Sequence, residues 1–202
     1  YKCIECFKKQ TYTNKELIII NNADSQFQAS NVNIDFETNV FLVDTPKRLE
    51  AGHARNYAIS AANGQILAQF DYDSWHDPSR LETQILALAQ NQAHVCILTS
   101  VFGYSYNSGH ARLIENPKKA ILNTMVFIRP SNIDYPKVEK YEEFGLLNKM
   151  INAGYKVISI EKPKLICKFN YSDKPINVIQ RTNLNKKNTK FINSVLRKRL
   201  KN

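Results

Sequence analysis

The chain has 202 residues and a formal net charge of +10, with 43% apolar and 10% aromatic residues. This length supports one domain with a sizeable core and is short for two. The sequence holds no apolar run near the roughly 18 to 20 residues of a membrane-spanning helix, and its first residues are too polar for a signal peptide. We therefore expect a folded domain with no segment that spans a membrane.

The positive charge is concentrated near the end of the chain. Eight basic residues follow residue 180 and no acidic residue follows Asp173, so the rest of the chain is close to neutral. We expect a main domain over residues 1–170 and a basic extension over 171–202 that ends in a helix. Packing on the domain is the first expectation for this helix, and contact with an anionic membrane surface is the second.

Four cysteines stand at positions 3, 6, 96 and 167. Cys3 and Cys6 lie on one face of an expected helix, and a zinc site would need a second pair of ligands. We interpret them as small buried residues of a reduced, cytoplasmic protein.

Strand and helix patterns alternate along the chain. Short apolar runs indicate strands, and apolar residues at helical spacing, often closed by glycine, indicate helices. The expected strands are 16–20, 40–43, 65–70, 94–101, 121–128, 157–160 and 165–169, and the expected helices are 49–62, 77–91 and 141–153. This order predicts an α/β sandwich, with a loop over residues 104–116.

Two carboxylates follow the strand expected to end at Phe70. Asp71 and Asp73 are one residue apart, and in an extended chain such side chains point the same way. Together they offer hard oxygen ligands to Mg²⁺ or Mn²⁺, which would neutralise a diphosphate and assist its departure. A solvated acidic turn is the commoner explanation for an isolated pair, whereas a crevice beyond the strand ends would favour ligand binding.

A second acidic pair, Glu142 and Glu143, begins the helix expected over 141–153. Acids in a first helical turn are favoured by the helix dipole, which is the simplest explanation of this pair. The alternative is a general base directed at a sugar hydroxyl. The expected apolar face of this helix consists of Phe144, Leu147 and Ile151.

Six short motifs follow one another in the first half of the chain. They are Gln-Thr-Tyr-Thr-Asn at 10–14, Glu-Leu-Ile-Ile-Ile at 16–20, Gly-His-Ala-Arg-Asn at 52–56, Ala-Asn-Gly at 62–64, Asp-Tyr-Asp at 71–73 and Pro-Ser-Arg-Leu-Glu-Thr-Gln at 78–84. In this order they resemble the motifs of the inverting family-two glycosyltransferases, and residues 142–147 resemble a later acidic segment of that family. The resemblance implies a GT-A fold, a three-layer α/β/α sandwich with a mostly parallel central sheet.

The resemblance also implies an activity. A sugar would pass, with inversion, from a nucleotide-diphosphate sugar to a saccharide or lipid-linked acceptor. A UDP-sugar is the favoured donor, and Mn²⁺ or Mg²⁺ is the implied cofactor. The reaction would take part in cell-surface polysaccharide or glycolipid synthesis. The implied residues are Asn21, Asn22, Arg55 and Asp71 for the donor, Asp73 with Asp71 for the metal, Glu143 ahead of Glu142 as general base, and Trp75 and His76 on the acceptor side. A surface position is the simpler expectation for His76 than a metal-binding one.

The chain departs from the family pattern at three places. The family's first strand is missing, so we expect an N-terminally truncated domain. The segment Asn21-Asn22-Ala23-Asp24 replaces Asp-Asp-Gly-Ser, and asparagine donates as well as accepts hydrogen bonds, which would change the donor preference. Residues 104–116 match no family motif.

Two other functions fit parts of the sequence. A nucleotidyltransferase also uses paired carboxylates and Mg²⁺, but it usually has a Gly-rich or basic phosphate motif near its first strand, and none is visible here. A catalytically inactive binding module would use the basic C-terminal helix on acidic lipid or nucleic acid. The leading prediction is a cytoplasmic transferase without a nucleic-acid partner, for which a peripheral contact at the inner face of the plasma membrane is an option.

Overall fold

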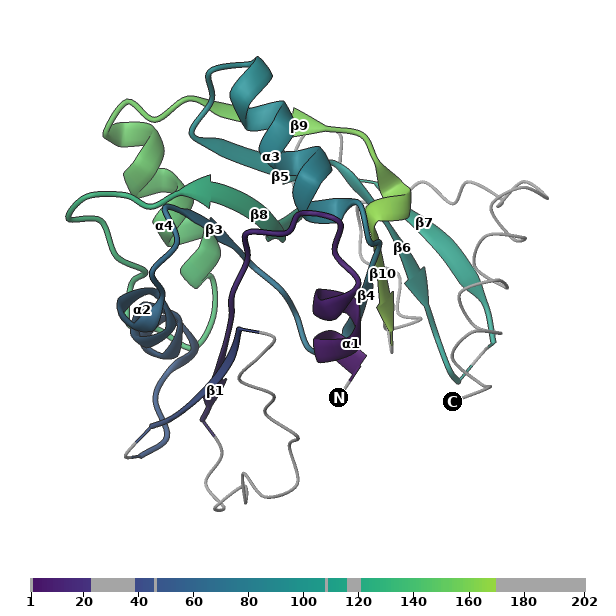
Figure 1. The fold of residues 1–202 in the computed structure, drawn as a ribbon, viewed down its shortest axis with the longest axis horizontal. Helices are drawn as coiled ribbons and strands as arrows, with labels where there is room; N and C mark the ends of the chain where they lie inside the picture. The colour runs from purple at the N-terminus through teal and green to yellow at the C-terminus, as the bar shows by residue number, and fades with distance from the viewer. Residues whose placement is uncertain (1, 23–38, 46, 108, 116–120, 170–202) are drawn as a thin grey trace.

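The computed structural model describes residues 2–22, 39–45, 47–107, 109–115 and 121–169 (Figure 1). The elements are α1 (Lys2–Lys8), β1 (Leu17–Asn21), β2 (Val40–Asp44), α2 (Ala51–Ala61), β3 (Ile66–Ala68), β4 (Ser74–His76), α3 (Arg80–Gln90), β5 (Val95–Leu98), β6 (Ser100–Tyr104), β7 (Ala111–Glu115), β8 (Ile121–Ile128), α4 (Glu142–Asn152), β9 (Val157–Ile160), the short 3₁₀ helix η3 (Pro163–Leu165) and β10 (Ile166–Phe169). The expected C-terminal helix, together with Ala23 and Asp24, lies outside the described residues. None of the described helices combines the length and apolarity needed to cross a bilayer.

The strands form three sheets, with the orders β1-β2, β3-β8-β5-β9 and β4-β10-β6-β7. Among the described strands, three pairings are parallel and four are antiparallel. The domain is therefore of the predicted α/β class, with two mixed four-stranded sheets and one parallel pair of strands.

Alternate residues of the central strands β5 and β8 face different helices. Val95 and Ile97 pack in the cluster that holds the buried residues of α4, whereas Cys96 and Val126 pack with Leu88 of α3. Because successive strand residues point to opposite faces, a strand covered on both sides is apolar throughout. This arrangement gives the three predicted layers, with α3 on one face of the sheet and α4 on the other.

Of the apolar face predicted for α4, only Leu147 is buried in the core. Leu146 and Met150 are fully buried, whereas Phe144 and Ile151 are 55% and 48% exposed. Glu142, only 6% exposed, is on the buried side, because it lies one helical turn before Leu146. Apolar residues occur on both sides of this helix, so their spacing alone did not identify the side that packs on the sheet.

Residues 94–116 contain more strand than predicted. The strand expected over 94–101 is two strands, because β5 ends at Leu98 and β6 continues in a different sheet. The loop expected over 104–116 contains β7, whose Ile114 lies opposite Val101 of β6. Ser105, Asn107 and Gly109, which indicated a loop, lie in the turn between β6 and β7.

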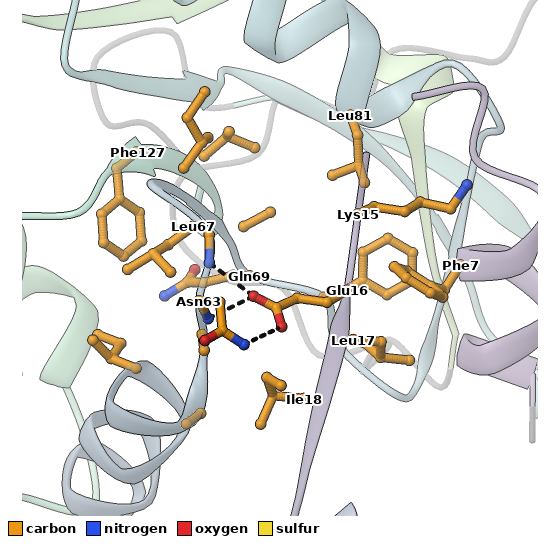
Figure 2. Close-up of a pocket in the computed structure, with 18 of the residues that line it drawn as sticks. Phe7, Lys15, Glu16, Leu17, Ile18, Asn63, Leu67, Gln69, Leu81 and Phe127 are labelled. Atoms are coloured by element: carbon orange, nitrogen blue, oxygen red, sulfur yellow. Dashed lines mark hydrogen bonds between the residues drawn. The ribbon is translucent and has the colours of Figure 1, made fainter. Parts of the chain in front are cut away.

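A groove separates β1 from β3 (Figure 2). It has a volume of about 810 Å³ and includes Phe7, Leu67 and Phe127 in its lining. In the described part of the chain β1 pairs only with β2, and β3 only with β8, so each leaves one strand edge beside the groove. An open strand edge is where a further strand can pair. The expectation that the family's first strand is missing stays a prediction.

Glu16 connects the two sides of this groove. Its Oε1 accepts hydrogen bonds from the backbone N–H groups of Asn63 at 2.6 Å and Gly64 at 2.8 Å, and its Oε2 accepts one from the Asn63 amide at 3.2 Å (Figure 2). The start of β1 is thereby fixed to the segment between α2 and β3.

Gly52 sets how closely α2 packs on the segment before α4. A Cβ at this position would overlap the carbonyl oxygen of Pro136 and lie 3.1 Å from the Cβ of Glu142. Because backbone cannot move aside cheaply, we expect Gly52→Ala to lower the free energy of unfolding by about 1–3 kcal/mol in urea denaturation. Gly64→Ala is the matched control, since its Cβ would meet its nearest neighbour at 3.4 Å. Equal losses in the two variants would contradict this account.

Candidate active site

Asp71 and Asp73 lie in the turn between β3 and β4. β3 ends at Ala68, so the strand predicted to reach residue 70 is shorter and both acids stand beyond it. The Asp71 side chain is half-buried and Asp73 is exposed. The hydroxyl of Ser74 donates to Asp73 Oδ1 at 3.3 Å. The turn therefore presents one half-buried carboxylate, that of Asp71, and one exposed carboxylate, that of Asp73.

The carboxylate of Asp71 is held by residues that the sequence analysis did not select. Asn123 of β8 donates from Nδ2 to Asp71 Oδ2 at 2.6 Å, and Lys168 of β10 donates from Nζ to Asn123 Oδ1 at 2.5 Å. Burial lowers the pKa of Lys168, while Asp71 and Asp73 act to raise it. A polar residue within an otherwise apolar strand was the available signal for both Asn123 and Lys168.

Arg55 of α2 bridges the two acids of α4. Its Nε lies 3.2 Å from Glu142 Oε1, and its Nη2 lies 2.8 Å from Glu143 Oε1. The guanidinium also lies 5.7 Å from the ring centroid of Tyr135. Arg55 is thus already paired with carboxylates, and its contact with a donor phosphate stays a prediction.

The environment of Glu143 changes its acidity. Burial raises the pKa of Glu143 above its ordinary value, Arg55 acts to lower it, and Glu142 and Asp71 act to raise it further. A carboxylate with a raised pKa accepts a proton more readily than a free one, as a general base requires. Asp71 is thus near enough to Glu143 to affect its acidity.

The side chain of Asn22 makes two hydrogen bonds with the backbone of Leu49, in the segment before α2. Its Nδ2 donates to the carbonyl of Leu49, and its Oδ1 accepts from the N–H of Leu49, each at 2.8 Å. The neighbouring Asn21 donates to Asp44 at 2.7 Å. Both amides therefore fix the end of β1, and their contact with a donor stays a prediction.

The two residues predicted for the acceptor side point in opposite directions from β4. Trp75 is half-buried against the cluster of Phe102 and Cys167, in the sheet β4-β10-β6-β7. His76 is only 2% exposed, so the expected surface position is wrong. Its ring lies against that of Phe70, with a centroid distance of 3.8 Å. His76 and Trp75 point apart because alternate residues of a strand face opposite sides. An acceptor role for either residue stays a prediction.

The family model for glycosyl transferase family 2 matches residues 1–152. The chain belongs to glycosyl transferase family 2. Within this family, the chain is 27% identical over 146 residues to the UDP-Glc:alpha-D-GlcNAc-diphosphoundecaprenol beta-1,3-glucosyltransferase WfgD of Escherichia coli. The match covers 71% of this chain and 51% of WfgD, so the chain spans about half the length of this relative.

Solved structures of glycosyltransferases share the fold of this family-2 domain. TarS of S. aureus in complex with UDP superposes with a TM-score of 0.65 at 13% identity, over 83% of this chain and 55% of TarS. The mannosyltransferase PcManGT from Pyrobaculum calidifontis, in complex with GDP-Man and Mn²⁺, gives a TM-score of 0.59 at 16% identity, over 82% and 51% of the two chains. These similarities confirm the predicted GT-A fold.

Opposite shifts are expected in the pKa of Glu143 when its two neighbours are changed. Arg55→Met removes the charge that lowers this pKa and should raise it, whereas Glu142→Gln removes a charge that raises it and should lower it. Titration of the Glu143 carboxyl carbon by NMR measures both shifts. Arg48→Met, which removes an exposed ion pair with Glu139, is the control and should leave the titration unchanged. Shifts in the same direction for the first two variants would contradict this electrostatic account.

Proposed function

We propose that this domain transfers a sugar from a nucleotide-diphosphate sugar to an acceptor hydroxyl, with inversion at the anomeric carbon. The observation that carries the proposal is the contact of Arg55 with both Glu142 and Glu143, in surroundings where Asp71 of a distant segment also affects the pKa of Glu143. Membership of glycosyl transferase family 2 supports sugar transfer as the chemistry.

On the donor side, the turn supplies oxygen ligands for a divalent cation. Asp73 is exposed, and Asp71 is held in place by Asn123. The described residues contain no group of three or more His, Cys, Asp or Glu side chains suited to a metal. Two carboxylates nevertheless fit Mg²⁺ or Mn²⁺, because such sites commonly take their other ligands from substrate phosphates and water. When bound, the metal would supply positive charge against the diphosphate.

On the acceptor side, Glu143 would take the proton from the attacking hydroxyl. The acceptor oxygen then bonds to the anomeric carbon as the bond from that carbon to the diphosphate oxygen breaks, and the electron pair leaves with the diphosphate. Attack from the face opposite the leaving group inverts the configuration. Arg55 holds the Glu143 carboxylate in place, and much of the rate would come from such positioning.

The related proteins indicate which substrates to test first. The name of WfgD gives UDP-Glc as its donor and a diphosphoundecaprenol-linked sugar as its acceptor. TarS has been crystallised with UDP and with UDP-GlcNAc. We therefore propose a UDP-sugar donor, bound near Asn21 and Asn22, and a lipid-linked saccharide acceptor near Trp75. Peripheral contact with the inner face of the plasma membrane, through residues 171–202, would bring the domain to such an acceptor.

Binding of UDP should depend on Mn²⁺ through Asp73. In calorimetric titrations, Mn²⁺ is expected to strengthen UDP binding, and Asp73→Asn should weaken the metal-dependent binding by about tenfold or more, equivalent to roughly 1.4 kcal/mol. Asp134→Asn, at an exposed acid in the segment before α4, is the control. Metal-dependent binding that persists undiminished in Asp73→Asn would exclude this residue as a ligand.

The substitution Glu143→Gln should remove the proposed general base and leave the site for the sugar donor intact. UDP release from UDP-glucose or UDP-GlcNAc, with a lipid-linked saccharide present, should fall by about 10²- to 10⁴-fold. The affinity for UDP with Mn²⁺ should stay within about twofold, because Glu143 lies outside the proposed metal ligands. Glu142→Gln is the matched comparison, and a larger loss of transfer there would assign the base to Glu142.

A further inference from the structure

A fully buried arginine lies next to the turn that carries Asp71 and Asp73. Arg80, at the start of α3, has 0% exposure. Its side chain hydrogen-bonds to neutral groups: Gln84 Oε1 at 3.1 Å, His76 Nδ1 at 2.8 Å, and the carbonyls of Gln69 at 2.6 Å and Thr124 at 3.4 Å. Burial lowers the pKa of Arg80 to about 10, against the opposing effect of Asp71. The side chain is therefore still a cation at neutral pH, in a position that disfavours charge.

The contact between Arg80 and His76 fixes the state of the imidazole. A guanidinium has only donors, so His76 Nδ1 must be the acceptor and carries no proton. In a neutral ring the proton is then on Nε2, and Nε2 lies 3.0 Å from the backbone carbonyl oxygen of Asp71.

A second connection leads from Arg80 to the Asp71 carboxylate. Arg80 and Gln84 both donate to the carbonyl of Thr124, Gln84 at 3.0 Å. Asn123, the preceding residue of β8, donates to Asp71 Oδ2. The backbone carbonyl of Asp71 is thus held by His76, which Arg80 contacts, and its carboxylate is held by the residue that precedes Thr124 in β8.

We propose that Arg80 is a positioning residue, which holds His76 in its Nε2–H tautomer so that the imidazole donates to the Asp71 carbonyl and fixes the turn in the geometry that presents Asp71 and Asp73. The consequence for the donor site rests on the proposed function, whereas the tautomer and its dependence on Arg80 do not. Lysine could not replace Arg80 equally well. The planar guanidinium donates to acceptors on four residues, and a single ammonium group cannot match that arrangement.

The tautomer of His76 is read directly by NMR of the ring nitrogens at neutral pH. The parent protein should show a protonated Nε2 and an unprotonated Nδ1. In Arg80→Leu the ring is expected to populate both tautomers, because nothing then requires Nδ1 to accept. The control Cys96→Ala removes a buried side chain beside Gln84, so it should lower stability while leaving the tautomer unchanged. A protonated Nδ1 in the parent, or an unchanged tautomer in Arg80→Leu, would overturn the proposal.

Substitutions of His76 test the link to the turn even if Arg80→Leu does not fold. In His76→Gln the amide nitrogen still donates toward the Asp71 carbonyl and its oxygen accepts from Arg80, so Mn²⁺-dependent UDP affinity should stay within a few-fold. His76→Met lacks the donor, and a loss of 10- to 100-fold is expected, as for other residues that orient metal ligands. Equal affinities in the two variants would overturn the positioning role. If the parent binds no UDP, the tautomer result still decides the role of Arg80, and only the proposed function fails.

Discussion

The balance of charge around Asp71 is the constraint on which the site depends. Three half-buried or buried acids, Asp71, Glu142 and Glu143, lie near the cations Arg55 and Lys168 as well as the buried Arg80. Each of the three acids has a hydrogen-bond or ion-pair partner on another element. A buried charge without a partner costs several kcal/mol. The contacts that balance the acids are therefore also the contacts that hold α2 to α4 and β8 to β10. Assembly of the fold and assembly of the site are one process, and a defect in one should appear in the other.

The two cations are not equivalent toward an arriving diphosphate. Arg55 is paired with two carboxylates, so much of its charge is already neutralised, and moving it to a phosphate would leave Glu142 buried without a partner. Lys168 donates to the neutral amide of Asn123, which leaves its charge free to act at longer range. Coulomb interactions between partly buried groups are screened less than those at the surface. Lys168 therefore keeps more of its charge unneutralised than Arg55 does, even though only Arg55 lies in a motif.

Local patterns in the sequence predicted what depends on neighbours along the chain. The runs that became β5 and β8, the helix after Pro78, and the two acidic pairs were all visible in short windows. The contacts of His76 were not, although Asp71 and Arg80 lie within five residues of it, because the shape of the turn and its burial decide which groups meet. Asn123 and Lys168 were missed because their contacts join segments that are distant in the sequence. Strand β7 was missed because its Arg and Glu residues interrupt the apolar alternation, and pairing with β6 decided its conformation.

The groove beside β1 bears on how precisely the donor site is held. β1 carries Asn21, at the proposed donor end, but side chains connect it to the rest of the domain: Glu16 reaches Asn63 and Gly64, and Asn22 reaches Leu49. Side-chain contacts position a strand less rigidly than a backbone ladder, in which every second residue of the strand is fixed on each side. A strand seated between β1 and β3 would place the donor loop and the Asp71 turn in one continuous sheet. The geometry of the sheet would then set the distance between the nucleoside and the metal. A fixed distance matters because the diphosphate between them must be aligned for the reaction.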